Sequence, residues 1–366
     1  MKYPLKMEKI NMRKMKLVPL AIFAVTIFDF MSCSDKKKTD AATSNVISEK
    51  ALKKIFANKP NPETDFDFQV NNDFTAVAIT GYKGQSASVY IPTEIQGVPV
   101  TEIATSFNRT IKQITSLYIP DSVTKIGKEA FSDEKDYLSG RDVPLCYMES
   151  VRLPENLKVI DSRTFSCLTS LKTVIFPKNL ERIERYAFYS CMSLESLTLP
   201  EPVYYIGKCA FQDAGIEILN LPSSLRVIEP NAFEKINAKN IVLPEGLLFL
   251  GENAFAKTQV QSVTFPASLK YVRRNVFGED NFLHEVIFPE QFEPVYISTE
   301  YNGDTRRGMD ITLLDVCNGS EILQSIALQK LLKSKAIMGV YTGFSMHDPE
   351  YKEFVKKYDT SRYLIP

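Results

Sequence analysis

Apolar residues recur through the middle of the chain in a unit of 22 or 23 residues, which one insertion lengthens between Pro120 and Pro154, and each unit carries a proline directly after an apolar residue. The prolines are Pro120, Pro154, Pro177, Pro200, Pro222, Pro244, Pro266 and Pro289. Eleven residues after each of the first seven stands a phenylalanine, at Phe131, Phe165, Phe188, Phe211, Phe233, Phe255 and Phe277. Counted from the proline, positions −3, −1, +3 and +6 are apolar as well. Offsets this regular indicate an internal repeat.

A single unit of this length cannot bury its own apolar positions, whereas stacked units turn each position into a continuous internal column. The residues before the proline alternate, as in Leu197-Thr198-Leu199, and predict a short strand with positions −3 and −1 facing inward. Strands of successive units would pair in parallel about 4.8 Å apart. The proline has no N–H to donate and would end each strand. We therefore expect a mainly β solenoid of 22–23-residue coils.

The units resemble BspA-type leucine-rich repeats, which read roughly Leu-x-x-Ile-x-Ile-Pro-x-x-Val-x-x-Ile-Gly-x-x-Ala-Phe. The segments 123–131 and 203–211 match the second half of this pattern closely. The resemblance covers residues 86–297 and implies a leucine-rich repeat array. Proteins similar to this family are often adhesins, so the resemblance also implies a protein partner on a host matrix or on another bacterial surface. Repeat scaffolds as such carry many unrelated partners.

The N-terminus has the pattern of a targeting segment. Residues 1–16 carry six basic side chains, and an apolar run of twelve residues follows from Leu17 to Phe28. A transmembrane helix needs about 20 apolar residues, so the pattern predicts a signal peptide over residues 1–32. The Ser32-Cys33 step resembles a bacterial lipobox, which would make Cys33 the lipidated first residue of the mature chain. Ordinary signal cleavage and a retained anchor remain alternatives.

Polar residues 33–45 are expected to form a linker between the lipid and the folded part. The chain would then be an exported outer-membrane lipoprotein, either exposed on the cell surface or facing the periplasm. It would contact the membrane through the lipid anchor only.

The segments on either side of the repeats are expected to cap the array, since the open ends of a solenoid expose its core. Residues 46–85 predict an N-terminal cap, with a helix near 48–57 and a hairpin of strands 66–70 and 74–79. Residues 298–366 predict a partly helical C-terminal cap. Its last helix begins at Asp348-Pro349 and has an apolar face made of Tyr351, Phe354, Val355 and Tyr358. The polar insertion at 132–147 predicts a surface loop.

Composition excludes several kinds of function. The chain has 44 basic and 44 acidic side chains, so it lacks the positive field that nucleic-acid binding needs. Two His and six Cys without a C-x-x-C pair give no pattern of metal ligands. There is no glycine-rich phosphate loop either. We expect no cofactor, no metal and no catalytic site, and we expect Cys167, Cys191 and Cys209 to be buried thiols.

Two columns of the repeat are expected to face outward. Position −2 would line the strand face, a candidate binding face made of Tyr118, Arg152, Ile175, Thr198, Asn220, Val242, Thr264 and Ile287. Position +5 would form a lateral stripe of apolar and aromatic side chains, made of Tyr205, Val227, Phe249 and Tyr271. An exposed stripe would suggest a partner surface, and packing under a cap or a neighbouring segment is the alternative. At position +9, Asn231, Asn253 and Asn275 predict a ladder that satisfies turn backbone groups.

These patterns favour a non-catalytic binding or adhesion lipoprotein that recognises a protein through its repeat surface. A glycan-binding accessory lipoprotein is the alternative, and Tyr205, Phe249 and Tyr271 would be its aromatic platform. An enzyme with a site in the flanking segments is a third hypothesis.

Overall fold

The computed structural model describes residues 59–105, 107, 113–132, 147–273, 276–278, 282–283, 285–287, 295–296 and 356–357. The predicted signal peptide, Cys33, the linker, the helix near 48–57, Asn275 and nearly all of the insertion and of residues 298–366 lie outside them. The described residues all belong to one unit of the chain, Val46–Pro366.

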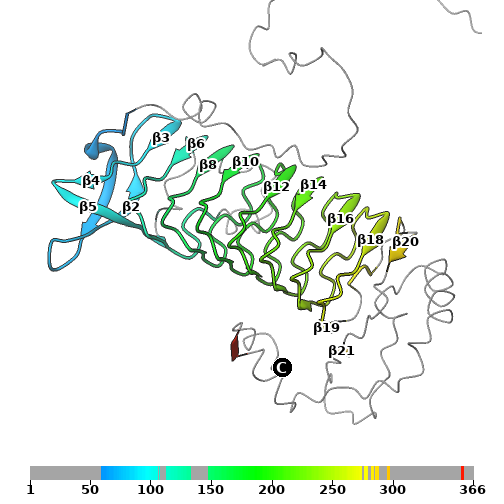
Figure 1. Ribbon diagram of the computed structural model, residues 1–366. Coiled ribbons are helices and arrows are strands. Elements are labelled where there is room, and N and C mark those ends of the chain that lie inside the picture. Colours follow the sequence, from blue (N-terminus) through cyan, green and yellow to red (C-terminus); the bar gives the residue numbers. More distant parts are fainter. Residues whose placement is uncertain are drawn as a thin grey trace, which may run out of the picture. The chain divides into compact units, whose positions relative to one another are not determined.

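Each coil contributes two short strands, and the strands of successive coils pair in parallel (Figure 1). The strands before the prolines form the first sheet: β3 (Ser88–Tyr90), β6 (Ser116–Tyr118), β8 (Ser150–Arg152), β10 (Thr173–Ile175), β12 (Ser196–Thr198), β14 (Ile218–Asn220), β16 (Asn240–Val242), β18 (Ser262–Thr264) and β20 (Glu285–Ile287). Two-residue strands form the second sheet. They stand at positions +5 and +6 in all but the last, which stands at +6 and +7: β9 (Val159–Ile160), β11 (Arg182–Ile183), β13 (Tyr205–Ile206), β15 (Val227–Ile228), β17 (Phe249–Leu250), β19 (Tyr271–Val272) and β21 (Val295–Tyr296). The mainly β solenoid predicted from the repeat is confirmed. The second strand of each coil was not predicted.

The two sheets differ in continuity. The second sheet is unbroken from β9 to β21, whereas the first is divided into β3–β10, β12–β14 and β16–β20. Neither β10 and β12 nor β14 and β16 are paired, although the coils continue to stack across both breaks. Each break leaves two strand edges facing one another without a shared ladder.

The core is a set of columns that run along the array. Positions +3 and +6 are buried in every coil from Val123 to Val272, and position −3 is buried in all but one of them. The phenylalanines at +11 form a continuous ladder from Phe131 to Phe277, with neighbouring ring centroids 5.1–5.6 Å apart and ring planes within 13° of parallel. Every ring in the ladder is buried, and each ring between the two ends is covered by the rings of the coils on either side.

The turns around the phenylalanine ladder are built on residues with positive φ. Positions +9 and +13 lie in the left-handed region, at Glu129, Arg163, Cys167, Tyr186, Ser190, Cys209, Asp213, Asn231, Lys235, Asn253 and Lys257. This backbone directs alternate N–H groups toward carbonyls of the next coil. The N–H of Phe233 donates to the Ala254 carbonyl at 2.8 Å, and the N–H groups of Asn231 and Lys235 donate to the carbonyls of Glu252 and Ala256 at 2.9 Å.

The asparagines at +9 therefore act through their backbone. Asn tolerates the left-handed region better than most residues. The side-chain Nδ2 of Asn231 donates to Glu234 at 2.7 Å, so it does not satisfy the turn backbone as expected.

The predicted hairpin precedes the array. Strand β1 (Phe66–Val70) pairs antiparallel with β2 (Val77–Tyr82), which begins three residues later than expected. Asn71 Oδ1 accepts the N–H groups of Thr75 and Ala76, and this turn leaves Phe74 exposed. Strand β2 then pairs with β5 (Val98–Ile103), which also pairs with β4 (Glu94–Ile95) and β7 (Lys125–Ile126). The 3₁₀ turn η1 (Glu63–Asp65) leads into β1.

The Phe211→Ala substitution is expected to lower the free energy of unfolding by about 3–5 kcal/mol, because it leaves a cavity between two stacked rings. Urea unfolding followed by circular dichroism measures it. Met192→Ala is the control, since Met192 is exposed and its loss should cost under about 1 kcal/mol. Equal losses for the two variants would show that the ladder does not stabilise the array.

Candidate binding surface

The strand face follows the alternation predicted from the sequence. Val263 of β18 points into the core, and its neighbour Thr264 is exposed. Position −2 is half-buried from Tyr118 to Ile175 and exposed from Thr198 onward. Val242 is the most exposed member, with 78% of its surface accessible. The candidate binding face is therefore exposed to solvent mainly in its C-terminal half.

The N-terminal part of the strand face is occupied by contacts within the chain. The Arg152 guanidinium lies 4.9 Å from the ring centroid of Tyr118, and Tyr118 in turn packs 4.1 Å from Tyr90. Arg152 also pairs with Asp121 at 2.5 Å and donates to the Ile119 carbonyl at 2.8 Å. Burial alone would raise the pKa of Asp121, but the hydrogen bonds from Arg152 and from the Glu155 N–H, together with the positive charge of Arg152, outweigh it and lower the pKa. The charged and aromatic groups of this cluster are paired with one another, so few of them are available to bind a partner.

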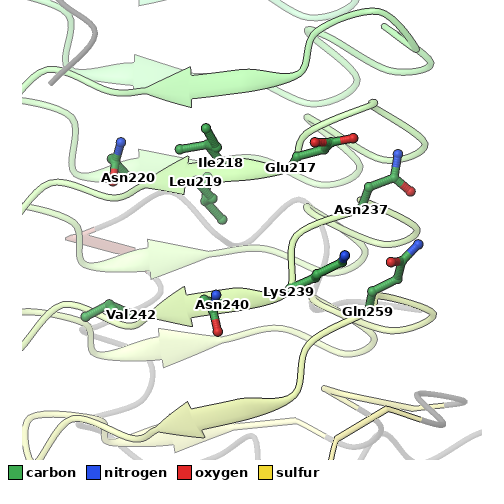
Figure 2. Close-up of a pocket in the computed structure, with 9 residues that line it drawn as sticks. All are labelled: Glu217, Ile218, Leu219, Asn220, Asn237, Lys239, Asn240, Val242 and Gln259. Atoms are coloured by element: carbon green, nitrogen blue, oxygen red, sulfur yellow. The ribbon is translucent and has the colours of Figure 1, made fainter. Parts of the chain in front are cut away.

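An open groove of about 630 Å³ lies where the first sheet breaks between β14 and β16 (Figure 2). Its lining comes from these two strands and from the turns that precede β16 and β18: Glu217, Ile218, Leu219, Asn220, Asn237, Lys239, Asn240, Val242 and Gln259. Figure 2 shows Asn237 and Gln259 at one end, and Asn220 and Val242 at the other. Of the predicted strand face, the groove includes Asn220 and Val242.

The groove combines amides with exposed aliphatic side chains. Four of the nine lining residues are Asn or Gln, which both donate and accept hydrogen bonds. Ile218 and Val242 add exposed apolar surface, and Glu217 and Lys239 carry opposite charges. Such a surface suits a partner that offers backbone amides and small apolar side chains.

Position −4 was missing from the predicted face. The alternation that turns position −2 outward also turns out position −4, here Ile218 and Asn240. That signal was present in the sequence. The break between β14 and β16 has no counterpart in the repeat pattern, so the groove itself was not predictable from it.

The lateral stripe is not an exposed surface, and the expectation that it faces a partner is wrong. Tyr205, Val227, Phe249 and Tyr271 are all buried, with at most 4% of each accessible. They are nevertheless outside the main core cluster, which includes their +6 neighbours Ile206, Ile228, Leu250 and Val272. Strand alternation points them away from that core, so they are buried on the outer face of the second sheet. The aromatic platform of the glycan hypothesis is therefore enclosed.

Two charged residues share this enclosed face. Glu229 and Arg273 both stand at position +7, and both are buried. Neither carboxylate oxygen of Glu229 has a hydrogen-bond partner, nor does Nε of Arg273. Burial raises the pKa of Glu229 to about 8, against the opposing charge of Arg273. The position between them is Gly251, where a Cβ would come within 2.4 Å of Glu229 backbone carbon, so only glycine fits.

The described residues contain no group of three or more His, Cys, Asp or Glu that could hold a metal ion. Cys167, Cys191 and Cys209 are buried thiols that form no disulfide, as predicted. Within the same part of the chain, no helix has the length and apolarity that a membrane span requires.

The Glu229→Gln substitution is expected to stabilise the protein at alkaline pH. The folded-state pKa of Glu229, about 8, lies above the ordinary carboxyl pKa of 4.5, so the folded protein retains the proton and stability falls as pH rises between these two values. At pH 9 the variant should gain at least about 1.4 kcal/mol, the equivalent of one pKa unit. At pH 4 the two proteins should match, and the exposed-site control Glu217→Gln should change neither value. The measurement is the urea midpoint of unfolding at both pH values. An equal gain in stability at pH 4 and pH 9 would contradict titration of Glu229.

Several solved structures are similar to the chain. A leucine-rich repeat protein from Bacteroides ovatus ATCC 8483 is 22% identical over 64% of this chain and 54% of that chain, with a TM-score of 0.44. The leucine rich repeat protein of T. pallidum is 23% identical, with 63% and 82% of the two chains covered and a TM-score of 0.33. The pneumococcal vaccine antigen PcpA is 19% identical, with 64% and 79% covered and a TM-score of 0.35.

The chain thus spans about half the length of the Bacteroides ovatus protein. No curated protein matches it significantly. The model of the BspA type leucine rich repeat region matches residues 87–138, 144–215 and 205–302, in six copies. These matches cover more than half of the chain and coincide with the stacked coils, so the chain belongs to the family of BspA-type leucine-rich repeat proteins.

Proposed function

We propose that this protein binds a protein partner, without catalysis, through the C-terminal half of its strand face. The groove between β14 and β16 is the centre of the proposed site. The observation that carries this proposal is the combination of an open groove with exposed Val242 and Ile218 on an otherwise regular strand face. Concave or broken surfaces of repeat arrays are the usual place for partners of such scaffolds.

The chemistry of the groove supports a polypeptide as the partner. Its amides can pair with backbone groups, and its aliphatic side chains can be covered by a second apolar surface. The whole chain carries equal numbers of basic and acidic side chains, so long-range attraction to a nucleic acid or an anionic membrane would be weak. None of the nine lining residues is aromatic, which removes the stacking platform that a glycan would use.

We also propose that the protein is displayed on the bacterial envelope as an adhesion lipoprotein. The support is the basic and apolar pattern of residues 1–32, the lipobox-like step before Cys33, and the polar stretch that follows. Proteins similar to this family are often adhesins, which supports a partner on a host matrix or on another bacterial surface.

Substitution of Val242 by Arg should weaken binding at least tenfold, which corresponds to about 1.4 kcal/mol, because it places a charge at the centre of the apolar contact. The probes are a panel of purified host matrix proteins and whole bacterial cells, measured by biolayer interferometry on the immobilised protein. The control is Val159→Arg, the same change at an exposed valine on the second sheet. A probe that binds both variants as tightly as the unmodified protein would exclude the strand face.

Surface display predicts that protease added to intact Gram-negative cells digests the full chain. Cys33→Ala should prevent lipidation and release the protein from the membrane fraction. The measurement is immunoblotting of shaved cells and of fractions, with a periplasmic protein as the control for intact cells. Full protection of the unmodified chain would contradict surface display, and unchanged fractionation of Cys33→Ala would contradict lipidation.

A further inference from the structure

The break between β14 and β16 leaves peptide groups on both sides of the groove without partners. In paired coils, the carbonyl at position −5 accepts N–H groups of the next coil, as the Glu195 carbonyl does from Glu217 and Ile218, at 2.8 and 3.1 Å. Across the break, the Glu217 carbonyl accepts neither the N–H of Lys239 nor that of Asn240. Within the described part of the chain, none of these three backbone groups has another hydrogen-bond partner. The groove is thus bordered by one free acceptor and two free donors.

The other end of the break repeats this pattern. Between β12 and β14, the Leu199 N–H donates to the Asn220 carbonyl at 3.3 Å. The equivalent groups across the break are the Leu221 N–H and the Val242 carbonyl, and no hydrogen bond joins them. Ladder groups point from one coil toward the next, so those left unpaired face into the groove. Free strand edges of this kind are templates on which another extended chain can pair.

Two unpaired charges lie at one end of the same groove. In the −5 column, Glu149 and Lys172 of adjacent paired coils form an ion pair, with Oε2 and Nζ 3.3 Å apart. Glu217 and Lys239 hold the same position on either side of the break, and both are exposed (Figure 2). No ion pair joins these two, so each charge is available to a partner. A polypeptide supplies charges of both signs, whereas a phosphate-bearing ligand would bring its negative charge against Glu217.

The size of the groove suits a short extended segment. Strands β14 and β16 are three residues long, about 10 Å at the rise of a strand. The volume of about 630 Å³ lies within the range of about 300–1,000 Å³ that is usual for sites of small ligands. Ile218 and Val242 border it with exposed aliphatic side chains, which the outward side chains of an extended segment can cover.

We propose that the groove binds an extended segment of the protein partner through the main chain of that segment. A partner N–H donates to the Glu217 carbonyl, and partner carbonyls accept the N–H groups of Lys239 and Asn240. One basic and one acidic side chain of the segment lie against Glu217 and Lys239. Pairing of this kind gives affinity through peptide groups and leaves the choice of partner to the side chains. The inference rests on the proposed function, because it specifies the chemistry of the partner at the same site.

Hydrogen exchange of single amides, measured by NMR on the full chain, tests whether the edge is free. The amides of Lys239 and Asn240 should exchange at least about tenfold faster than that of Gln261, which donates to the Lys239 carbonyl at 3.0 Å in the next, paired coil. Equal protection of the three amides would show that the edge is already paired and would overturn the proposal.

A library of random short peptides, displayed on phage and selected on the immobilised full chain, tests binding. Selected peptides, synthesised and measured by biolayer interferometry, should bind Val242→Arg at least about tenfold more weakly and the control Val159→Arg unchanged. Bound peptide should slow exchange at Lys239 and Asn240 at least about tenfold. N-methylation of one peptide residue at a time should weaken binding about tenfold at one or two central positions, where an N–H donates, and not at the ends.

The charges are tested by repeating the selection on the double variant Glu217→Lys, Lys239→Glu, which leaves the net charge unchanged. Peptides selected on the unmodified protein should share one basic and one acidic residue at a fixed spacing. Those selected on the double variant should carry the two charges in the reverse order. The same order on both proteins would contradict the contacts proposed for Glu217 and Lys239.

The results that overturn the inference differ from those that overturn the proposed function. If every N-methylated peptide binds as tightly as the parent, main-chain recognition is wrong, although the strand face remains the binding site. The inference also fails if no peptide is selected, if the peptides bind Val242→Arg unchanged, or if they protect Ser196 at the break between β10 and β12 instead of Asn240. The proposed function fails only if matrix proteins and bacterial cells also bind Val242→Arg unchanged.

Discussion

Ring-on-ring stacking of the phenylalanines at position +11 fixes the rise and the alignment of the coils. Each ring lies within 5.6 Å of the next and nearly parallel to it from Phe131 to Phe277, so one coil can neither tilt nor slide without separating a pair. The spacing of the rings is close to the spacing of parallel strands, about 4.8 Å. The aromatic ladder and both backbone ladders can therefore repeat together over the whole array.

The turns that hold these rings depend on an unusual backbone. Left-handed residues at positions +9 and +13 bracket the phenylalanines from Phe165 to Phe255 and direct alternate N–H groups toward the next coil. None of the described residues at these positions is glycine, so each position carries conformational strain. The backbone hydrogen bonds and the ring contact on each side hold them in place. A coil taken alone would lose both, which explains why a unit of this kind exists only within an array.

Because the coils superpose, any side chain that points outward becomes part of a column, and the two sheets present two different faces. The strand face is closed by the Arg152 cluster near its N-terminal end and opens at the break between β14 and β16. The outer face of the second sheet is open near Val159 and enclosed from Tyr205 to Tyr271. Exposure thus rises toward the C-terminal end on the strand face and falls toward that end on the outer face of the second sheet. The side chains accessible to a partner therefore lie on the C-terminal half of the first sheet.

The sequence by itself determined the coil length, the parallel stacking, the inward columns and the outward direction of position −2, because the same pattern recurs in every unit of the repeat. It also placed the lateral stripe correctly in direction, with Tyr205 and Phe249 turned away from the core. Only the tertiary structure decided that this stripe is enclosed, that Glu229 is buried beside it, and that Asn220 and Val242 border a groove. A repeat pattern records what each coil shares with its neighbours. The burial of position +5 differs from coil to coil, and the groove depends on two coils that stack without pairing, so neither follows from the repeat.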